Sequence, residues 1–200
     1  MKKGLDAAAK GIRIIMVPPV IVTVFLLLLW GSDRGIFGDT ANLLVSILGL
    51  GLVPVLAYLL WAIVPGLRRK GRKTQRSLAF LFSLIGYIGT FLYGHIHGVP
   101  EKLLLILDSY LASLLLLSFI NYVIRIKASG HACSVAGPLV LFVYFAGWVS
   151  LIPCLAIEVL SCWASHRTKR HTLSQLLLGT AAALCAFGIA WLLHHLFGEL

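Results

Sequence analysis

Long charge-free runs alternate with short basic segments along this chain of 200 residues. A helix needs about 20 apolar residues to cross a bilayer core, so the longer runs predict membrane-spanning helices. One block, residues 132–163, is too long for a single span and is interrupted by the stretch GWVSLIP, so two short helices are expected there. The predicted spans are residues 14–31, 41–65, 77–95, 103–124, 132–148, 149–163 and 172–197.

This pattern predicts an all-α, polytopic membrane helix bundle with six to seven transmembrane helices, in one integral membrane domain over residues 1–200. The pair Pro18–Pro19 is expected to kink or to start the first helix. Composition agrees with this architecture, because 60% of the residues are hydrophobic and only 12% are charged. Soluble domains carry about 25% charged residues, so an ordinary soluble domain is excluded.

Basic residues are expected to gather on one side of the membrane. With seven spans, the N-terminus and the segments 68–76, 125–131 and 165–171 share a side that holds 15 of the 17 Lys and Arg residues. The positive-inside rule predicts that this side is cytoplasmic and that the chain is a multi-pass protein of the cell membrane. Because topology accounts for the net charge of +10, nucleic acid is not expected as a partner.

The three internal basic segments also hold the residues whose side chains could take part in a reaction. Each has an ordinary explanation when taken alone. A basic loop sets topology or attracts anionic lipid, and a single histidine at a helix end is usually solvated. Together they suggest a catalytic site, because two histidines and several cations around one pocket suit phosphoryl transfer.

Ser129, Gly130 and His131 are predicted to start a helix. Free backbone N–H groups and the helix dipole favour an anion at such a position. Lys127 and Arg125 add positive charge there, and His131 is a candidate proton donor.

His171 is predicted to start a second helix at the same end. Arg167 and Arg170 precede it, and Gln175 lies one turn further along the same face. In such a site one imidazole would attack phosphorus and the other would protonate the leaving oxygen.

The chain resembles the type 2 phosphatidic acid phosphatase superfamily, most closely its small, divergent prokaryotic members. The likeness extends over about residues 127–179 and rests on Lys127-Ala-Ser-Gly-His131, Val135-Ala-Gly-Pro138 and Arg167…His171-Thr-Leu-Ser-Gln175…Gly179. Members of that superfamily are integral membrane lipid phosphatases that need no metal.

The resemblance implies a role for each matching residue. His171 corresponds to the nucleophile that forms a phosphohistidine, and His131 to the acid that protonates the leaving oxygen. Ser129 and Gly130 correspond to the segment that holds the phosphate. Arg69 and Arg76 have the spacing of the cations in the first motif, although Ser77 follows where proline is the rule.

Two positions depart from the family pattern. Ser165 stands where the family has an arginine six residues before the nucleophile, and Arg167 could replace that arginine only in a rearranged loop. Gln175 stands where the family has an aspartate. Its amide oxygen can orient an imidazole but cannot stabilise an imidazolium as a carboxylate does. Glu158 is an alternative partner for the imidazole, since an ionisable residue within a span is a functional candidate.

Together with these residues, the resemblance implies a metal-independent hydrolase, without a cofactor, that acts on a phosphate monoester or diphosphate of a membrane lipid. The substrate would be a polyprenyl diphosphate or a phosphatidic-type lipid, and the partners would be this substrate and the bilayer. The first alternative is a catalytically degenerate protein that binds lipid headgroups or moves lipid. The second is a metal enzyme using His131, Cys133, Cys162, His166 and His171. Asp108 is expected near the opposite interface in a structural role.

Overall fold

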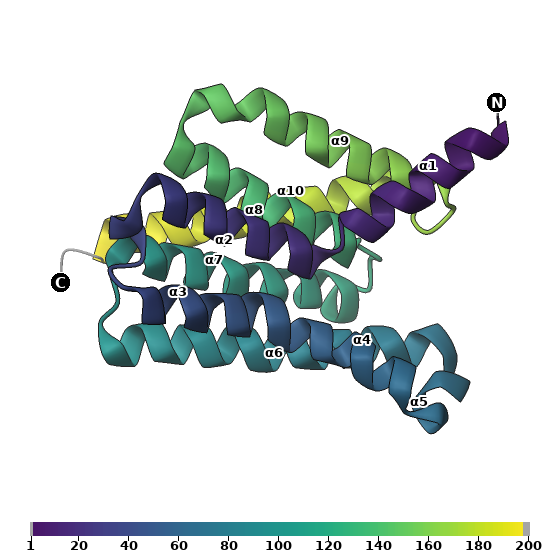
Figure 1. Cartoon of the computed structure of the whole chain (residues 1–200), viewed down its shortest axis with the longest axis horizontal. Helices are drawn as coiled ribbons and strands as arrows, with labels where there is room; N and C mark the ends of the chain where they lie inside the picture. The colour runs from purple at the N-terminus through teal and green to yellow at the C-terminus, as the bar shows by residue number, and fades with distance from the viewer. Residues whose placement is uncertain (1, 198–200) are drawn as a thin grey trace.

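All regular structure in residues 2–197, which the computed structural model describes, is helical, and no β-strand occurs in that range (Figure 1). Side chains are described throughout this range except at positions 2, 3 and 72. The α-helices are α1 Lys2–Ile15, α2 Pro18–Ser32, α3 Thr40–Ser46, α4 Val53–Ile63, α5 Pro65–Arg69, α6 Gly71–His97, α7 Glu101–Ser118, α8 Gly130–Ala146, α9 Leu151–Arg167 and α10 Leu173–Phe197. The π-helical segments η2 Ile47–Leu52 and η3 Phe119–Val123 extend α3 and α7, and the 3-10 turns are η1 Arg34–Ile36 and η4 Trp148–Ser150.

The described residues support five or six of the six to seven predicted spans. Five segments of the described chain are long and apolar enough to cross a bilayer, namely Thr40–Ile63, Lys73–His97, Glu101–Val123, Trp148–Arg167 and Leu173–Phe197. A sixth would combine Gly4–Ile15 with Pro18–Ser32, which are bent by 58° at the predicted proline break. The helix α8 has 17 residues, so seven full-length spans stay a prediction.

The expected break inside residues 132–163 is confirmed. The helix α8 ends at Ala146, and Gly147 follows with a φ of +86°, a conformation that favours glycine. The turn η4 then leads into α9. The block is therefore a helical hairpin rather than one long helix.

The outer surface of the bundle carries many large apolar side chains. Trp148 is 82% exposed and Val149 is 91% exposed, and leucines are exposed along α2, α4, α9 and α10. A soluble protein rarely exposes so much continuous apolar surface. Together with the long apolar helices, this surface suggests a multi-pass membrane protein.

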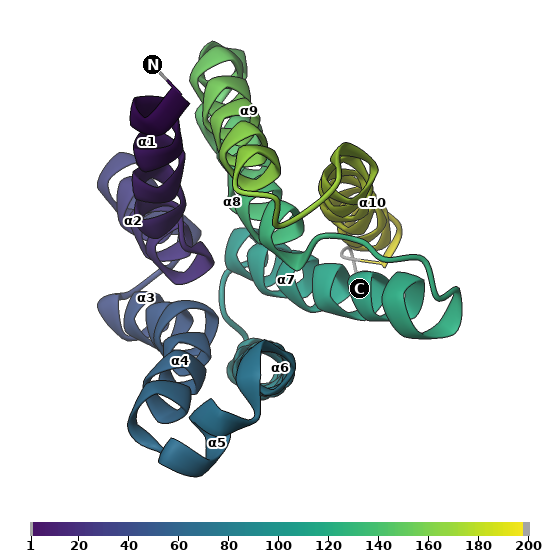
Figure 2. The same ribbon diagram turned by 90° about the vertical axis from the view of Figure 1, so that its right-hand side faces the viewer.

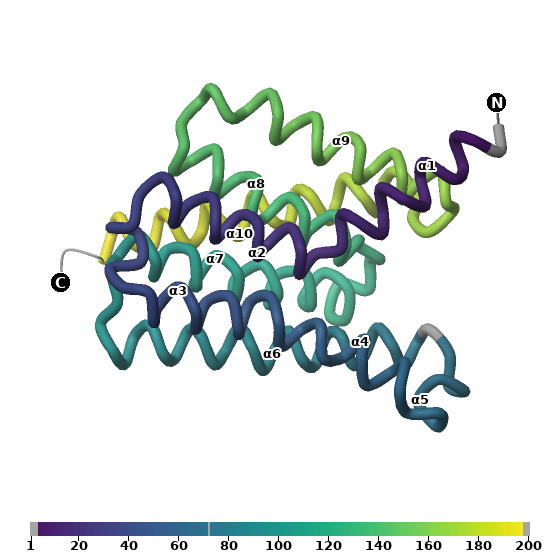
Figure 3. The backbone as a smooth tube through the Cα atoms, in the orientation of Figure 1, coloured from purple at the N-terminus to yellow at the C-terminus, as the bar shows by residue number. Residues whose placement is uncertain are grey.

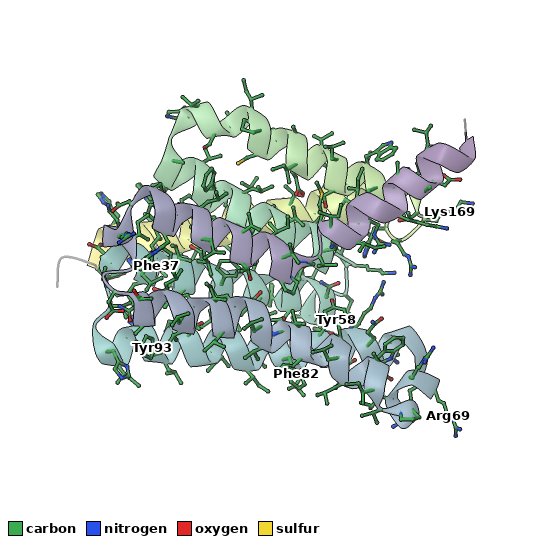
Figure 4. All side chains as sticks on the ribbon, viewed as in Figure 1. Phe37, Tyr58, Arg69, Phe82, Tyr93 and Lys169 are labelled. Atoms are coloured by element: carbon green, nitrogen blue, oxygen red, sulfur yellow. The ribbon has the colours of Figure 1, made fainter. Side chains whose placement is uncertain are left out.

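The helices run back and forth along one long axis, so the connections gather at two ends (Figures 1 and 3). Arg69 and Lys169 lie at one end, and Phe37 and Tyr93 lie at the other (Figure 4). The end with Arg69 and Lys169, called the basic end below, holds the start of α1, α5 and the α9–α10 connection. The predicted grouping of the basic segments is thus observed, while the side of the membrane stays a prediction.

Packing contacts between helices hold the bundle together. The helix α10 packs against α7 and α8, α2 against α8, α4 against α6, and α1 against α9. The backbones of η2 and α6 touch through Gly49 and Gly86, because a Cβ on Gly86 would lie 2.1 Å from the carbonyl oxygen of Gly49. The largest core cluster includes Val22, Leu26, Leu29, Leu50, Leu103, Ile106, Leu107 and Leu141.

Candidate active site

A cavity of about 750 Å³ lies among the helices toward the basic end. Five of its lining side chains are arginine or lysine, two are histidine, and none of its described lining residues is Asp or Glu. Its inner wall is largely apolar and aromatic, with residues from α2, η2, α4, α6 and α7. The charged lining residues are Arg13, Arg76, Arg125, Lys127 and Arg170, beside His131 and His171. The cavity therefore combines an anion-attracting part with an apolar part.

The structure brings some of the predicted site residues together here and leaves others outside. The lining includes five of the nine, which are Lys127, Gly130, His131, Arg76 and His171. The four outside the lining are Ser129, Gln175, Arg167 and Arg69.

The segment before α8 is held in place by side chain and backbone together. The side chain of Asn121 accepts a hydrogen bond from the backbone N–H of Ala128 at 3.0 Å. Arg125 has a φ of +64°, a left-handed conformation that is rare for a residue with a side chain. The backbone N–H of Ser129 donates to the carbonyl oxygen of Gln175 at 2.9 Å. These contacts fix Lys127 and the start of α8 at the cavity wall.

Ser129 begins α8 as predicted, but its hydroxyl is used within the helix. It caps the first turn, accepting from the backbone N–H of Ala132 at 3.3 Å, and the residue is fully buried. The expected direct contact of this hydroxyl with phosphate therefore has no geometric support. Gly130 lines the cavity in its place.

The orientation of His171 follows from Gln175. The Oε1 atom of Gln175 lies 3.2 Å from Nδ1 of His171 and accepts from the backbone N–H of Thr172 at 3.4 Å. Because a backbone N–H can only donate, this amide atom is the acceptor oxygen, and Nδ1 must carry a proton. The Nε2 atom of His171 is then left with a free lone pair, as a nucleophile requires.

Gly179 lets the two histidine segments come close. A Cβ added to this residue of α10 would lie 2.3 Å from the carbonyl oxygen of Ser129. The glycine therefore allows α10 to rest against the segment that leads into His131.

His131 lies in the first turn of α8, where Oγ of Ser161 on α9 is 3.3 Å from its Nε2 atom. Burial lowers the pKa of His131 to about 4, with contributions from the charges of Arg13 and His171. Burial also lowers the pKa of His171, against the hydrogen bond to Gln175, and the cations Arg76, Lys127 and Arg13 add to the lowering. Both imidazoles are therefore biased toward the neutral form, because burial and the nearby positive charges both disfavour the imidazolium.

The remaining predicted residues have other partners or positions. Arg167 forms an ion pair with Asp6 of α1 at 2.9 Å. Arg69 is exposed on α5. Ser165 is fully buried, and its hydroxyl has no hydrogen-bond partner among the described residues. Glu158 accepts from the hydroxyl of Thr180 at 2.6 Å rather than contacting His171.

Sequence reasoning missed three residues of this region. Arg13 was counted only as a basic residue of the N-terminus, and no local pattern sets it apart. Ser161 also lacks a local signal. Asn121, an amide inside the apolar run 103–124, could have been found, because polar residues within spans are often functional.

The described His, Cys, Asp and Glu side chains form no group of three or more that could hold a metal ion. Comparisons with protein-family models, with curated proteins and with solved structures found no match for this chain.

Proposed function

We propose that this protein is a metal-independent lipid phosphatase that hydrolyses a phosphate monoester or diphosphate of a membrane lipid through a phosphohistidine on His171. The observation that carries the proposal is the convergence of His131, His171 and five cations on one cavity with an apolar inner wall. Such a cavity suits a molecule with an anionic head and a hydrocarbon tail. The resemblance to the type 2 phosphatidic acid phosphatases supports the same activity.

In the first step, Nε2 of His171 attacks phosphorus and the bond from phosphorus to the leaving oxygen breaks. His131 gives its proton to that oxygen, which is the lipid oxygen of a monoester or the bridging oxygen of a diphosphate. In the second step, water attacks the phosphohistidine and passes a proton to His131. Orthophosphate leaves, and the electrons of the P–N bond return to His171.

The cations have two roles in this proposal. They neutralise the phosphoryl oxygens in the transition state. One of them, Arg13, also adds to the lowering of the His131 pKa that burial causes. A bound phosphate reverses this effect, since a nearby negative charge favours the imidazolium. The substrate therefore helps His131 to become the acid that the reaction needs.

The lining and the charges of the cavity also bear on the lipid tail of the substrate and on the side of the membrane where the site would lie. The apolar wall, which includes Val22, Leu50 and Leu114, suits either a polyprenyl diphosphate or a phosphatidic-type lipid. By the positive-inside rule, the cations of the basic end support a site on the cytoplasmic face of the cell membrane.

Phosphate release tests the proposal. The purified chain in detergent with EDTA is expected to release orthophosphate from at least one lipid phosphate or diphosphate in a substrate panel. The His171→Ala variant should be inactive, because no phosphohistidine can form. His166→Ala is the matched control, since His166 is exposed on the same segment and does not line the cavity. If the wild type releases no more orthophosphate than the His171→Ala variant from every substrate, the proposed enzymatic activity is refuted.

A second function is favoured by the departures from the family motif. Ser165 offers no positive charge, and Arg167 is paired with Asp6. A cavity of this kind can bind a phosphorylated headgroup without cleaving it. Saturable binding of a lipid phosphate without phosphate release, equal in wild type and His171→Ala, would favour this lipid-binding function.

A further inference from the structure

The N-terminal helix reaches the candidate active site, although it lies far from the histidine motifs in sequence. The helix α1 packs alongside α9 (Figure 2). Arg13 lies in its last turn and lines the cavity that holds His131 and His171. One guanidinium nitrogen of Arg13, Nη1, donates to the hydroxyl of Thr168 at 3.5 Å. Thr168 precedes His171 in the α9–α10 connection, so Arg13 is tied to the segment of the nucleophile.

An ion pair holds the same helix at a second point. Asp6 pairs with Arg167 at 2.9 Å. Asp6 and Arg13 are seven residues apart, which is about two helical turns, so both lie on one face of α1. Arg167, the arginine that the sequence offered as a phosphate ligand, thus anchors the helix that brings Arg13 to the cavity.

The position where the family has its arginine is closed to a charge here. Ser165 is fully buried within α9. A phosphate bound beside His171 would therefore draw its positive charge from the cations that line the cavity, and Arg13 lines it together with both imidazoles. Its charge contributes to the lowered pKa of His131 and of His171, which places it within electrostatic range of each.

We propose that Arg13 binds the phosphoryl group in the cavity, in the role that the family pattern would give to an arginine at position 165. This inference rests on the proposed function. The planar guanidinium can donate two parallel hydrogen bonds to equatorial phosphoryl oxygens. Asp6 and Arg167 are positioning residues that act through α1.

The test uses the full chain in detergent, with orthovanadate as a probe of the phosphoryl site. In Arg13→Gln, kcat for the best lipid substrate should fall by about 10²- to 10³-fold, as when one transition-state donor is lost. Protection by vanadate against thermal unfolding should be lost as well. Lys10→Ala is the matched control, because Lys10 is a cation of the same helix that is exposed and does not line the cavity. It should behave as wild type.

The outcomes separate this inference from the proposed function. An active wild type with Arg13→Gln within about threefold of it overturns the role of Arg13 and leaves the phosphatase standing. An inactive wild type that vanadate protects, with no protection of Arg13→Gln, refutes the phosphatase and supports Arg13 as the anion ligand. If vanadate protects the wild type and Arg13→Gln equally, or protects neither of them, the inference is overturned.

A second variant covers the case in which Arg13→Gln does not fold. Arg13→Lys keeps the charge but loses the two-pronged donor geometry. A kcat at least about tenfold below wild type, at an unchanged unfolding temperature, would support the proposal. A kcat within about threefold of wild type would overturn it.

Discussion

The backbone N–H of Ser129 donates to the carbonyl oxygen of Gln175 across 2.9 Å, which joins the segments that carry His131 and His171. Gly179 makes this contact possible, because its missing Cβ leaves room for the carbonyl group of Ser129. This hydrogen bond and the close approach at Gly179 therefore help to set the relative position of the two imidazoles.

Gly179→Ala should separate these segments. The new Cβ would lie 2.3 Å from a backbone oxygen, so α10 must shift, at a cost of about 1–3 kcal/mol in the free energy of unfolding. Phosphate release per folded molecule should fall as well. Denaturant unfolding and activity assays in detergent measure both effects.

Gly188→Ala is the control for this change, because a Cβ on Gly188 of the same helix meets nothing within 4 Å. It should be neutral or stabilising by up to about 1 kcal/mol. Identical behaviour of the two variants would show that the close approach at Ser129 has no importance.

Replacing the amide of Gln175 by a carboxylate should strengthen the nucleophile. Gln175→Glu keeps the length that spans 3.2 Å to Nδ1 of His171 and adds a negative charge. The charge raises the pKa of His171 and stabilises its imidazolium. We expect a higher kcat above neutral pH and an acid limb displaced to higher pH. Gln175→Leu should lower kcat, and a Glu variant no faster than Leu would contradict the orienting role.

The pH profile should reflect the lowered pKa of His171. In the proposed mechanism the imidazole of His171 must be neutral to attack, and its pKa is lowered from the ordinary value of 6.5, chiefly by burial. Activity should therefore persist as the pH falls through 6.5 and disappear only at lower pH. The acid limb of kcat/KM, which reports the free enzyme, measures this.

Arg76→Ala tests the direction in which the acid limb of the pH profile moves. The charge of Arg76 contributes to the lowered pKa of His171, so its removal should move the acid limb toward higher pH. Arg69→Ala, which removes an exposed cation outside the cavity lining, should leave the limb in place. Equal limbs in the two variants would argue against His171 as the titrating group.

Asp108 should contribute to stability without affecting catalysis. Its carboxylate accepts from Nε2 of His95 on α6 at 3.1 Å and from Nε2 of His194 on α10 at 2.7 Å, so it links three helices. Asp108→Asn should lower the free energy of unfolding by about 1–3 kcal/mol, because a mostly buried hydrogen-bond acceptor is weakened. Glu101→Gln, an exposed acid of the same helix, is the control. Unchanged stability of Asp108→Asn would contradict the structural role.

Local sequence patterns were sufficient to predict much of the helical organisation. The last span was predicted at residues 172–197, and α10 is Leu173–Phe197. The break near Gly147 and the helix start at Ser129 were also predictable, because turn and capping preferences depend on neighbouring residues. The pairing of His171 with Gln175 follows equally from their spacing of one turn.

Contacts between distant segments were beyond the reach of such patterns. The contact of the Ser129 backbone with Gln175 depends on how α10 packs against the start of α8. Whether Arg167 or Arg13 faces the cavity depends on the docking of α1 against α9. The sequence separation of 155 residues between Arg13 and Thr168 leaves no periodic signal.

That separation has a consequence for the order in which the molecule matures. A ribosome makes α1 before the α9–α10 connection, so the contact between Arg13 and Thr168, 155 positions apart, can form only after the intervening helices have been made. Partly inserted chains therefore lack the assembled cavity wall. The candidate site would therefore be incomplete until α9 and α10 had joined the bundle.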